Sequence, residues 1–173
     1  GVVKIVQQHA DLLALRTGRQ IQITAVSARD PRKNRDADLS GYAWETDPVA
    51  LAKRDDVDVF VEVMGGHEGA ARDATEAAIA AGKDVVTANK ALLAHYGHEL
   101  ALAAESAGRV IRFEAAVAGG IPVIKSLTEG LAGNQMRRVM GVMNGSCNYI
   151  LTRMQNEGLS YEAVFDEARQ LGY

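Results

Sequence analysis

The sequence lacks several features that would have assigned it to a class of protein at once. Its single cysteine, Cys147, excludes an internal disulfide and is typical of a reducing cytoplasm. Its net charge of −3 gives no reason to expect nucleic acid or an anionic membrane surface as a partner. Its apolar stretches are short and broken by charges, so no membrane span is expected, and no signal-peptide pattern opens it. These absences predict a soluble cytoplasmic protein.

A phosphate-binding G-x-G-x-x-G motif is also missing, although it is the best single mark of a dinucleotide-binding fold. The chain opens instead on apolar residues at helical spacing, from Val2 to Leu15, in a helix that ends at Gly18. The strand that would precede such a helix is missing too. If a nucleotide-binding domain is present, we therefore expect it to be incomplete at its N-terminal end.

What is present is a regular alternation of strands and helices. A buried strand ends near Ser27, and a polar loop follows it up to Asp47, which is expected to cap a short helix with Pro48 in its first position. Beyond this helix, strands are predicted over residues 57–64, 84–88 and 109–117, and helices over 65–82 and 89–108. This order implies right-handed crossovers and a parallel sheet with helices on both faces, a Rossmann-like α/β architecture.

The pattern changes near residues 115–120. A glycine-rich bend leads into a helix over residues 118–134, a long strand is predicted over 135–145, and two helices cover 146–158 and 160–173. A strand of this length suits a second, partly antiparallel sheet. The fold class is therefore α/β, with a Rossmann-like parallel-sheet domain in residues 1–116 and part of a second α/β domain in residues 117–173.

Candidate binding residues follow the predicted strands, because ligands of an open parallel sheet bind outside the carboxyl ends of its strands. Gly65 and Gly66 would let a backbone turn approach a ligand, and Lys90 stands where a strand gives way to a helix. Arg29 follows the earlier strand, where an arginine can accept the 2′-phosphate of a dinucleotide. The alternatives are an ordinary strand-to-helix turn, a solvated helix start and an exposed pair of Arg29 with Asp30.

Three segments together carry a resemblance to a known family. They read "VTANKALL", "FEAAVAGGIPVIKSL" and "GVMNGSCNYILTRM", in this order, with "AVSARD" and "DLSG" upstream. On these segments the chain resembles homoserine dehydrogenase over essentially all of its 173 residues. The resemblance implies an oxidoreductase that interconverts L-homoserine and L-aspartate 4-semialdehyde with NAD(P)(H), in threonine and methionine biosynthesis. It also implies a Rossmann domain followed by a substrate and dimerisation domain, and hence a homodimer or a higher homo-oligomer.

The same resemblance implies roles for individual residues. Lys90 would be catalytic, in the crevice between nicotinamide and substrate. The cofactor, NADP or NAD, would be bound by Arg29, Gly65, Gly66, Thr87, Ala88, Asn89 and Lys90. The substrate would be approached by Gly145 and Ser146. A Na+ ion would be held by Glu114 and by the carbonyl oxygens of Val117, Gly119 and Ile121, a set of oxygen ligands that suits a monovalent cation.

Relative to the family, the chain lacks the phosphate loop in front and the segment with the principal catalytic lysine behind. A polypeptide of these residues alone is therefore expected to have no useful dehydrogenase activity, and its exposed sheet edges are expected to make it associate. Two other functions stay open: a semialdehyde-type dehydrogenase with Cys147 as its nucleophile, and a nucleotide-binding domain without catalysis. The first would need a catalytic histidine, and no histidine follows Cys147.

Overall fold

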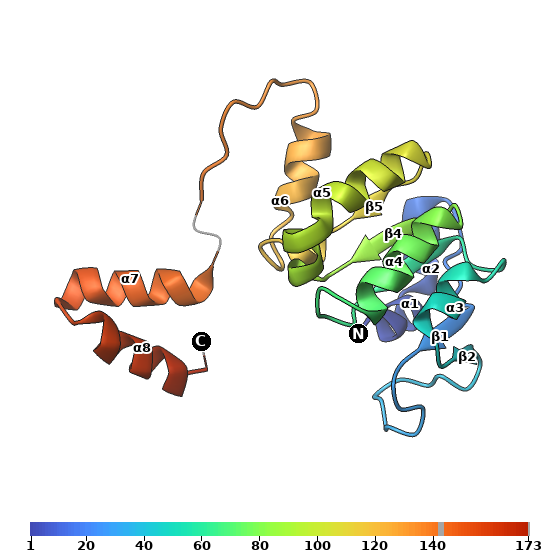
Figure 1. Ribbon diagram of the computed structural model, residues 1–173, viewed down its shortest axis with the longest axis horizontal. Helices are drawn as coiled ribbons and strands as arrows, with labels where there is room; N and C mark the ends of the chain where they lie inside the picture. The colour runs from blue at the N-terminus through green and yellow to red at the C-terminus, as the bar shows by residue number, and fades with distance from the viewer. Residues whose placement is uncertain (142–143, 173) are drawn as a thin grey trace. The chain divides into compact units, whose positions relative to one another are not determined.

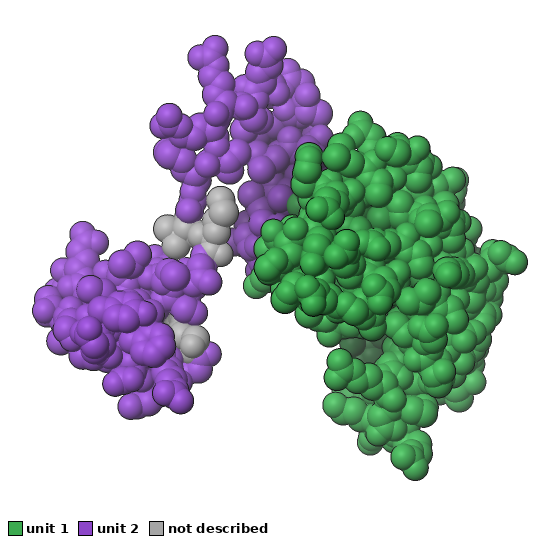
Figure 2. Space-filling model, in the orientation of Figure 1, with its two compact units in different colours: residues 1–116 green, residues 117–173 purple. Residues whose placement is uncertain are grey.

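The computed structural model describes residues 1–141 and 144–172. Two compact units divide the chain, residues 1–116 and residues 117–173 (Figure 2). All strands found in the described residues belong to the first unit, and every pair of neighbouring strands is parallel (Figure 1). The predicted α/β class with parallel strands is therefore confirmed.

Two short strands, β1 (Ala25–Ser27) and β2 (Ala43–Glu45), pair in parallel and form a sheet of their own. The first ends where the sequence predicted a strand to end, although residues 20–24 before it are irregular. The second lies inside the predicted polar loop and was missed. Its three residues stand among turn-forming aspartate, serine and glycine residues, so no alternation long enough to indicate a strand is present.

The strand β2 carries Trp44, the only tryptophan of the chain. The guanidinium carbon of Arg35 lies 5.5 Å from the centroid of its ring, within cation–π range. Within the described residues, the buried indole Nε1 has no hydrogen-bond acceptor. Trp44 is half-buried in this smaller sheet, where its ring contacts Arg35 and its indole N–H makes no hydrogen bond to the described residues.

The larger sheet has three parallel strands in the order β3-β4-β5. Their bounds are Val59–Glu62, Asp84–Thr87 and Ile111–Arg112. They are joined by α4 (Ala70–Ala80) and α5 (Lys90–Ser106), so the predicted strand–helix alternation is confirmed, with shorter strands. In the register of β3 and β4, Glu62 stands opposite Thr87, and both strands therefore end at the same level.

The core of residues 1–116 lies on one face of this sheet. Phe60 of β3 and Val85 of β4 pack with apolar residues of α3 (Pro48–Lys53), α4 and α5. The alternate residues of the same strands point the other way, and Val59, Val61 and Val86 are 47%, 41% and 37% exposed. The larger sheet is thus covered on one face and has an apolar, solvent-exposed second face, so the prediction of helices on both faces is wrong for the described strands.

The short helix α3 begins as predicted. The side-chain oxygen of Asp47 accepts a hydrogen bond of 2.9 Å from the backbone N–H of Val49, and Pro48 follows as the first helical residue. The helix buries Leu51 and Ala52 in the core described above. A local sequence signal therefore sets both the start of this helix and the face that it buries.

The N-terminal segment forms two helices, α1 (Val2–Gln8) and α2 (Ala10–Thr17), where the sequence predicted one. The break falls at His9, and α2 ends at Gly18 in the left-handed conformation with φ of 70°. Neither helix contains a buried residue. No helix of the described residues combines the length and the apolar character needed to cross a membrane.

Residues 117–173 contain helices only, within the part that is described. They are α6 (Val123–Lys125), a π-helical turn η2 (Ser126–Gly130), α7 (Gly145–Glu157) and α8 (Tyr161–Gln170). The last two pair through buried Ile150, Val164 and Ala168. Ser160 caps α8 by accepting from the backbone N–H of Ala163, so the two predicted helices and the predicted cap are confirmed.

The long strand predicted over residues 135–145 is wrong for the part that the structure describes. Residues 135–141 are exposed and have no regular structure, residues 142–143 lie outside the described residues, and Gly145 already belongs to α7. The alternation of arginine with apolar residues gave the prediction, but a strand also needs a neighbour that accepts and donates its backbone hydrogen bonds. In the described residues this segment has no such neighbour.

Candidate functional site

The carboxyl ends of β3 and β4 form the place at which several predicted residues meet. Residues 63–69 leave β3 at this edge and residues 88–90 leave β4, on strands that are hydrogen-bonded to each other. In an open parallel sheet this edge is where ligands bind. The geometry of the two segments therefore decides what the site can hold.

A buried carboxylate, Glu62, lies at the end of β3 and has no exposed surface. Its Oε1 accepts hydrogen bonds from the backbone N–H groups of Met64, at 2.6 Å, and Gly65, at 3.3 Å. Its Oε2 accepts from the hydroxyl of Thr87, at 2.7 Å. Buried polar groups need partners of this kind, and here they come from both segments.

Thr87 and Asn89 continue the hydrogen bonding along the second segment. The hydroxyl oxygen of Thr87 accepts from the backbone N–H of Asn89, at 3.0 Å. The side-chain amide of Asn89 donates to the carbonyl of Gly66, at 2.6 Å, and its oxygen accepts from the N–H of Leu92, at 3.1 Å. Asn89 is therefore the cap of α5 and at the same time a tie to the glycine turn.

The glycine turn after β3 uses a conformation that other residues rarely adopt. Gly65 and Gly66 have φ of 80° and 82°, and both are exposed. A Cβ built on either would meet no atom within 4 Å, so the space above the turn is open. The turn thus presents bare backbone to open space at the ligand edge, which fits the close approach of a nucleotide cofactor.

Lys90 is the first residue of α5 and is exposed, directly after the buried Asn89. Ala88, on the other side of Asn89, is half-buried and donates its N–H to the backbone carbonyl of Glu62, at 3.1 Å. Within residues 87–90 the structure therefore turns Thr87 and Asn89 inward and leaves the lysine in solvent. Gly65, Gly66, Thr87, Ala88, Asn89 and Lys90 all belong to this one edge.

Arg29 is not part of this hydrogen-bonded edge. It follows β1, in the smaller sheet, and is exposed. The neighbouring Asp30 accepts from the backbone N–H of Arg32, at 2.9 Å. The loop acid thus has Arg32 as its partner, in place of the Arg29–Asp30 pair that the sequence left open.

The residues of the predicted cation site lie where the two units of the chain join in sequence. Glu114 opens the 3-10 turn η1 (Glu114–Ala116) and is half-buried. Val117 is half-buried, whereas Gly119 and Ile121 are exposed, in a loop where Gly120 has φ of 83°. Among the described residues there is no group of three or more histidine, cysteine, aspartate or glutamate side chains that could hold a metal ion.

The predicted substrate residues, Gly145 and Ser146, are the first two residues of α7. Asn144 caps this helix by accepting from the backbone N–H of Cys147, at 2.8 Å. Cys147 itself is an exposed free thiol. These residues lie in the second unit, and the structure describes them as a capped helix start.

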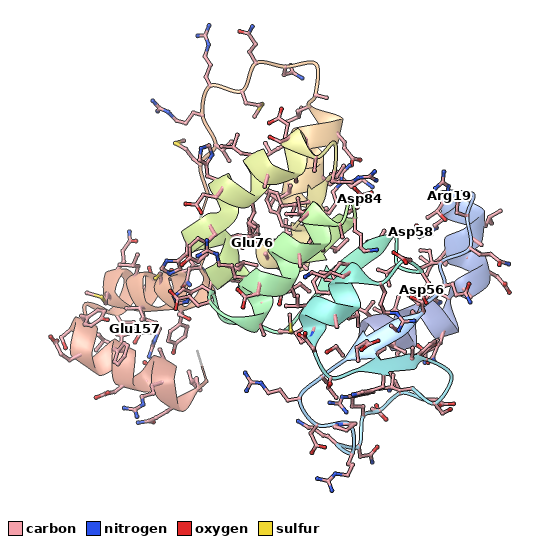
Figure 3. The ribbon with its side chains drawn as sticks, turned by 45° about the vertical axis from the view of Figure 1, so that its right-hand side comes forward. Arg19, Asp56, Asp58, Glu76, Asp84 and Glu157 are labelled. Atoms are coloured by element: carbon pink, nitrogen blue, oxygen red, sulfur yellow. The ribbon has the colours of Figure 1, made fainter. Side chains whose placement is uncertain are left out.

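A cleft lies at the opposite, amino ends of the strands. Arg19, Asp58 and Asp84 are among the residues that line it (Figure 3). Lys83, in the same lining, has a buried ammonium that donates to the backbone carbonyls of Arg54 and Val57, the latter at 2.5 Å. The ammonium of Lys83 thus connects the start of β4 to the segment between α3 and β3 by hydrogen bonds to the backbone. Its role in this charged cleft is therefore structural.

Sequence reasoning missed Glu62. The signal that could have found it is the alternation in "VFVE", which puts Glu62 on the same face as Phe60, and hence on the buried face. An acidic residue at a buried strand position, next to a glycine turn, needs hydrogen-bond donors close by. The adjacent segment "TANK" offers a hydroxyl, but the pairing of the two segments is visible only in the fold.

Two family models match this chain. The one described as homoserine dehydrogenase, NAD binding domain, matches residues 1–114. The one described as homoserine dehydrogenase matches residues 122–173. The two matches together cover both units of the chain.

Individual relatives agree with the family models. The homoserine dehydrogenase of Neisseria gonorrhoeae is 44% identical over 173 residues, which is 100% of this chain and 39% of that protein. A solved homoserine dehydrogenase from Thiobacillus denitrificans has a TM-score of 0.83 at 40% identity, over 98% of this chain and 39% of its own. A hyperthermophilic archaeal homoserine dehydrogenase in complex with NADPH has a TM-score of 0.65 at 29% identity, over 95% of this chain and 46% of its own. The chain spans less than half the length of these relatives.

Proposed function

Because this chain belongs to the homoserine dehydrogenase family, we propose that its protein interconverts L-homoserine and L-aspartate 4-semialdehyde with NAD(P)(H). This places it in threonine and methionine biosynthesis. The observation that carries the proposal is the edge of β3 and β4, where a bare glycine turn and the exposed Lys90 follow neighbouring strands. The family match favours this reaction over a cysteine-dependent dehydrogenase and over a nucleotide-binding domain without catalysis.

The cofactor would be held at the glycine turn. Gly65 and Gly66 have open space where side chains would otherwise stand, and the left-handed conformation suits glycine. When bound, the nicotinamide accepts or donates the hydride. The protein's own part is to hold the turn in place, through the hydrogen bonds of Glu62 and Asn89.

Lys90 would act on the substrate oxygen. Its ammonium can orient that oxygen by a hydrogen bond and can assist the movement of its proton. The capped start of α5 fixes the backbone from which this side chain extends. In this proposal Lys90 assists, and the principal proton-transfer lysine belongs to the part of the family sequence beyond residue 173.

The finer parts of the proposal concern ligands and assembly. Arg29 would take the 2′-phosphate of NADP, and Gly145 and Ser146 would approach homoserine. Na+ would be bound by Glu114 and by the carbonyl oxygens of Val117, Gly119 and Ile121, because a carboxylate and neutral oxygens suit a cation of low charge. The protein would be a cytoplasmic homodimer or higher homo-oligomer. Activity that does not depend on the monovalent cation present would contradict the Na+ part of this proposal.

The function is tested by reduction of NADP+ in the presence of L-homoserine, with the full-length protein. Lys90→Ala is expected to lower kcat by about tenfold or more, since a hydrogen bond from a charged group is lost where the reaction occurs. Lys53→Ala is the matched control, because Lys53 is an exposed lysine in the last turn of α3. A Lys90→Ala enzyme with the kcat of the Lys53→Ala enzyme would contradict the role of Lys90.

A further inference from the structure

Glu62 is the only acidic side chain that is buried in the described part of the chain. None of the ion pairs of the described residues includes it, and its oxygens are satisfied by hydrogen-bond donors. A carboxylate without exposure or a cationic partner is costly to bury, and it persists only where donors are directed at it. Its position beside the ligand edge therefore calls for an explanation beyond packing.

The donors to Glu62 come from both segments that leave the sheet at this edge. Two are the backbone N–H groups that open the glycine turn, those of Met64 and Gly65. The third is the hydroxyl of Thr87, one strand away, at the start of the segment that ends in Lys90. One carboxylate thus holds both segments. Its Oε1 holds the start of the glycine turn, and its Oε2 holds Thr87.

The second segment completes a continuous network of hydrogen bonds. Thr87, held by Glu62, accepts from the N–H of Asn89, and the amide of Asn89 donates to the carbonyl of Gly66. Asn89 is also the cap of α5, directly before Lys90. The glycine turn is therefore hydrogen-bonded to Glu62 at its start and to Asn89 at Gly66. The start of α5, which carries Lys90, belongs to the same network.

We propose that Glu62 is a positioning residue, which sets the glycine turn and the start of α5 in register so that cofactor and Lys90 meet the substrate together. This proposal rests on the proposed function for its catalytic half. Its binding half, the hold on the turn that receives the nucleotide, is independent of the substrate. Thr87 links Glu62 to Asn89, because its hydroxyl donates to the carboxylate of Glu62 and accepts from the N–H of Asn89. The residue Thr87 is only 1% exposed.

The test compares substitutions that each remove hydrogen bonds of this network. Glu62→Gln keeps the shape, but an amide presents one acceptor and one donor and cannot receive all three bonds. Thr87→Val removes the bridging hydroxyl, and Thr87→Ser restores it. Controls are Thr75→Val, a buried hydroxyl bonded to Ala71 inside α4, and Asp84→Asn, whose carboxylate accepts from the N–H of Val110 at the opposite end of β4.

The measurements are the Kd of NADPH, from its fluorescence in a titration of the full-length protein, and kcat and KM with homoserine. Glu62→Gln and Thr87→Val are each expected to raise the Kd by about tenfold and to lower kcat at saturating cofactor. Thr87→Ser is expected to recover most of the affinity and kcat that Thr87→Val loses, and both controls are expected to stay within about twofold of the wild type. Thermal unfolding of each variant shows whether it is folded.

Each outcome decides the proposal. Glu62→Gln protein with a lower Tm but an unchanged Kd and kcat would mean that Glu62 is structural only, and would overturn it. So would a Thr87→Ser protein as impaired as Thr87→Val. Wild-type protein that binds NADPH but does not turn over homoserine would contradict the proposed function, while the Kd of the variants would still test the binding half. Wild-type protein that binds neither NADPH nor NADH would overturn both.

Discussion

Adjacent side chains at the carboxyl end of β4 have opposite surroundings. Thr87 and Asn89 are 1% and 5% exposed, and their side chains form hydrogen bonds within the protein. Lys90, in contrast, is exposed. Only the lysine is therefore free to reach a ligand, and the residues before it determine where it stands. A motif that is continuous in sequence thus contains residues with different tasks, which substitutions can separate.

The proposed contact of Arg29 with the 2′-phosphate of NADP leads to a prediction about one residue. Arg29→Ala is expected to raise the Kd of NADPH by about tenfold and to leave that of NADH unchanged, since only NADPH has a 2′-phosphate for the guanidinium to bind. Fluorescence titration with each cofactor measures both constants. Arg32→Ala is the matched control, because Arg32 is an exposed arginine of the same loop. Equal changes for the two cofactors would contradict the role of Arg29.

At the scale of residues, the sequence predicts the exposed members of the site better than the buried ones. Lys90 and the glycines Gly65 and Gly66 follow strands in the sequence, so position alone indicates the ligand edge. Glu62 was missed because its importance comes from Thr87, which is 25 residues away in the chain and one strand away in the sheet. The pairing of two strands is needed before that contact can be inferred.

Elements with local start and stop signals agree with their predictions. The cap Asp47 with Pro48, the cap Ser160 and the left-handed Gly18 each mark a helix end from neighbouring residues alone. The short strand β2 and the irregular residues 135–141 were both mispredicted. A strand exists only where a partner strand supplies hydrogen bonds, and the identity of that partner is not contained in the local pattern.

The pairing of α7 with α8 is expected to depend on pH. The carboxylate of Glu167 in α8 accepts from the hydroxyl of Tyr149, at 2.6 Å, and from the guanidinium of Arg153, at 2.9 Å, both in α7. These bonds, first that of Tyr149 and then that of Arg153, hold the pKa of Glu167 below its ordinary value of 4.5. The bond to Glu167 also raises the pKa of Tyr149 above its ordinary value of 10.0.

The signs of these shifts fix the range of pH. A carboxyl group with a lowered pKa stabilises the folded state fully above its unfolded pKa, and this contribution is lost as the pH falls through the folded pKa. A phenol with a raised pKa contributes below its unfolded pKa and loses that contribution as the pH rises through the folded one. The pair of helices is therefore expected to be most stable between about pH 4.5 and 10.

Amide hydrogen exchange of α7 and α8 at a series of pH values measures this stability, after correction for the intrinsic pH dependence of exchange. Protection is expected to fall with acid in the wild type, and Glu167→Gln is expected to weaken that acid dependence. Asp166→Asn is the matched control, because Asp166 is an exposed neighbour in the same helix. An acid dependence that Glu167→Gln leaves unchanged would show that this carboxylate is not its source.

At the scale of the whole molecule, the main feature is the number of apolar side chains that are exposed to solvent. Val59, Val61 and Val86 are exposed on the second face of the larger sheet. Leu15, in α2, is 83% exposed and Ile5, in α1, is 55% exposed. Exposed apolar surface of this kind favours association, since burying it removes it from water.

The 173-residue polypeptide by itself is therefore expected to self-associate. Sedimentation velocity should give a sedimentation coefficient that rises with protein concentration. The double variant Val59→Thr, Val61→Thr, which keeps β-branched side chains, is expected to associate less, because it makes the exposed face of β3 more polar. A wild-type polypeptide that stays monomeric at all concentrations would contradict the expectation.

The place of Trp44 makes the smaller sheet optically distinct. As the only indole of the chain, it reports through its emission on β1 and β2, whereas the larger sheet, its helices and the pair α7–α8 contain no tryptophan. Far-ultraviolet circular dichroism, in contrast, is dominated by the helices. The two signals therefore follow different parts of the same polypeptide, and the gap between their midpoints in a urea titration measures how far the smaller sheet unfolds on its own.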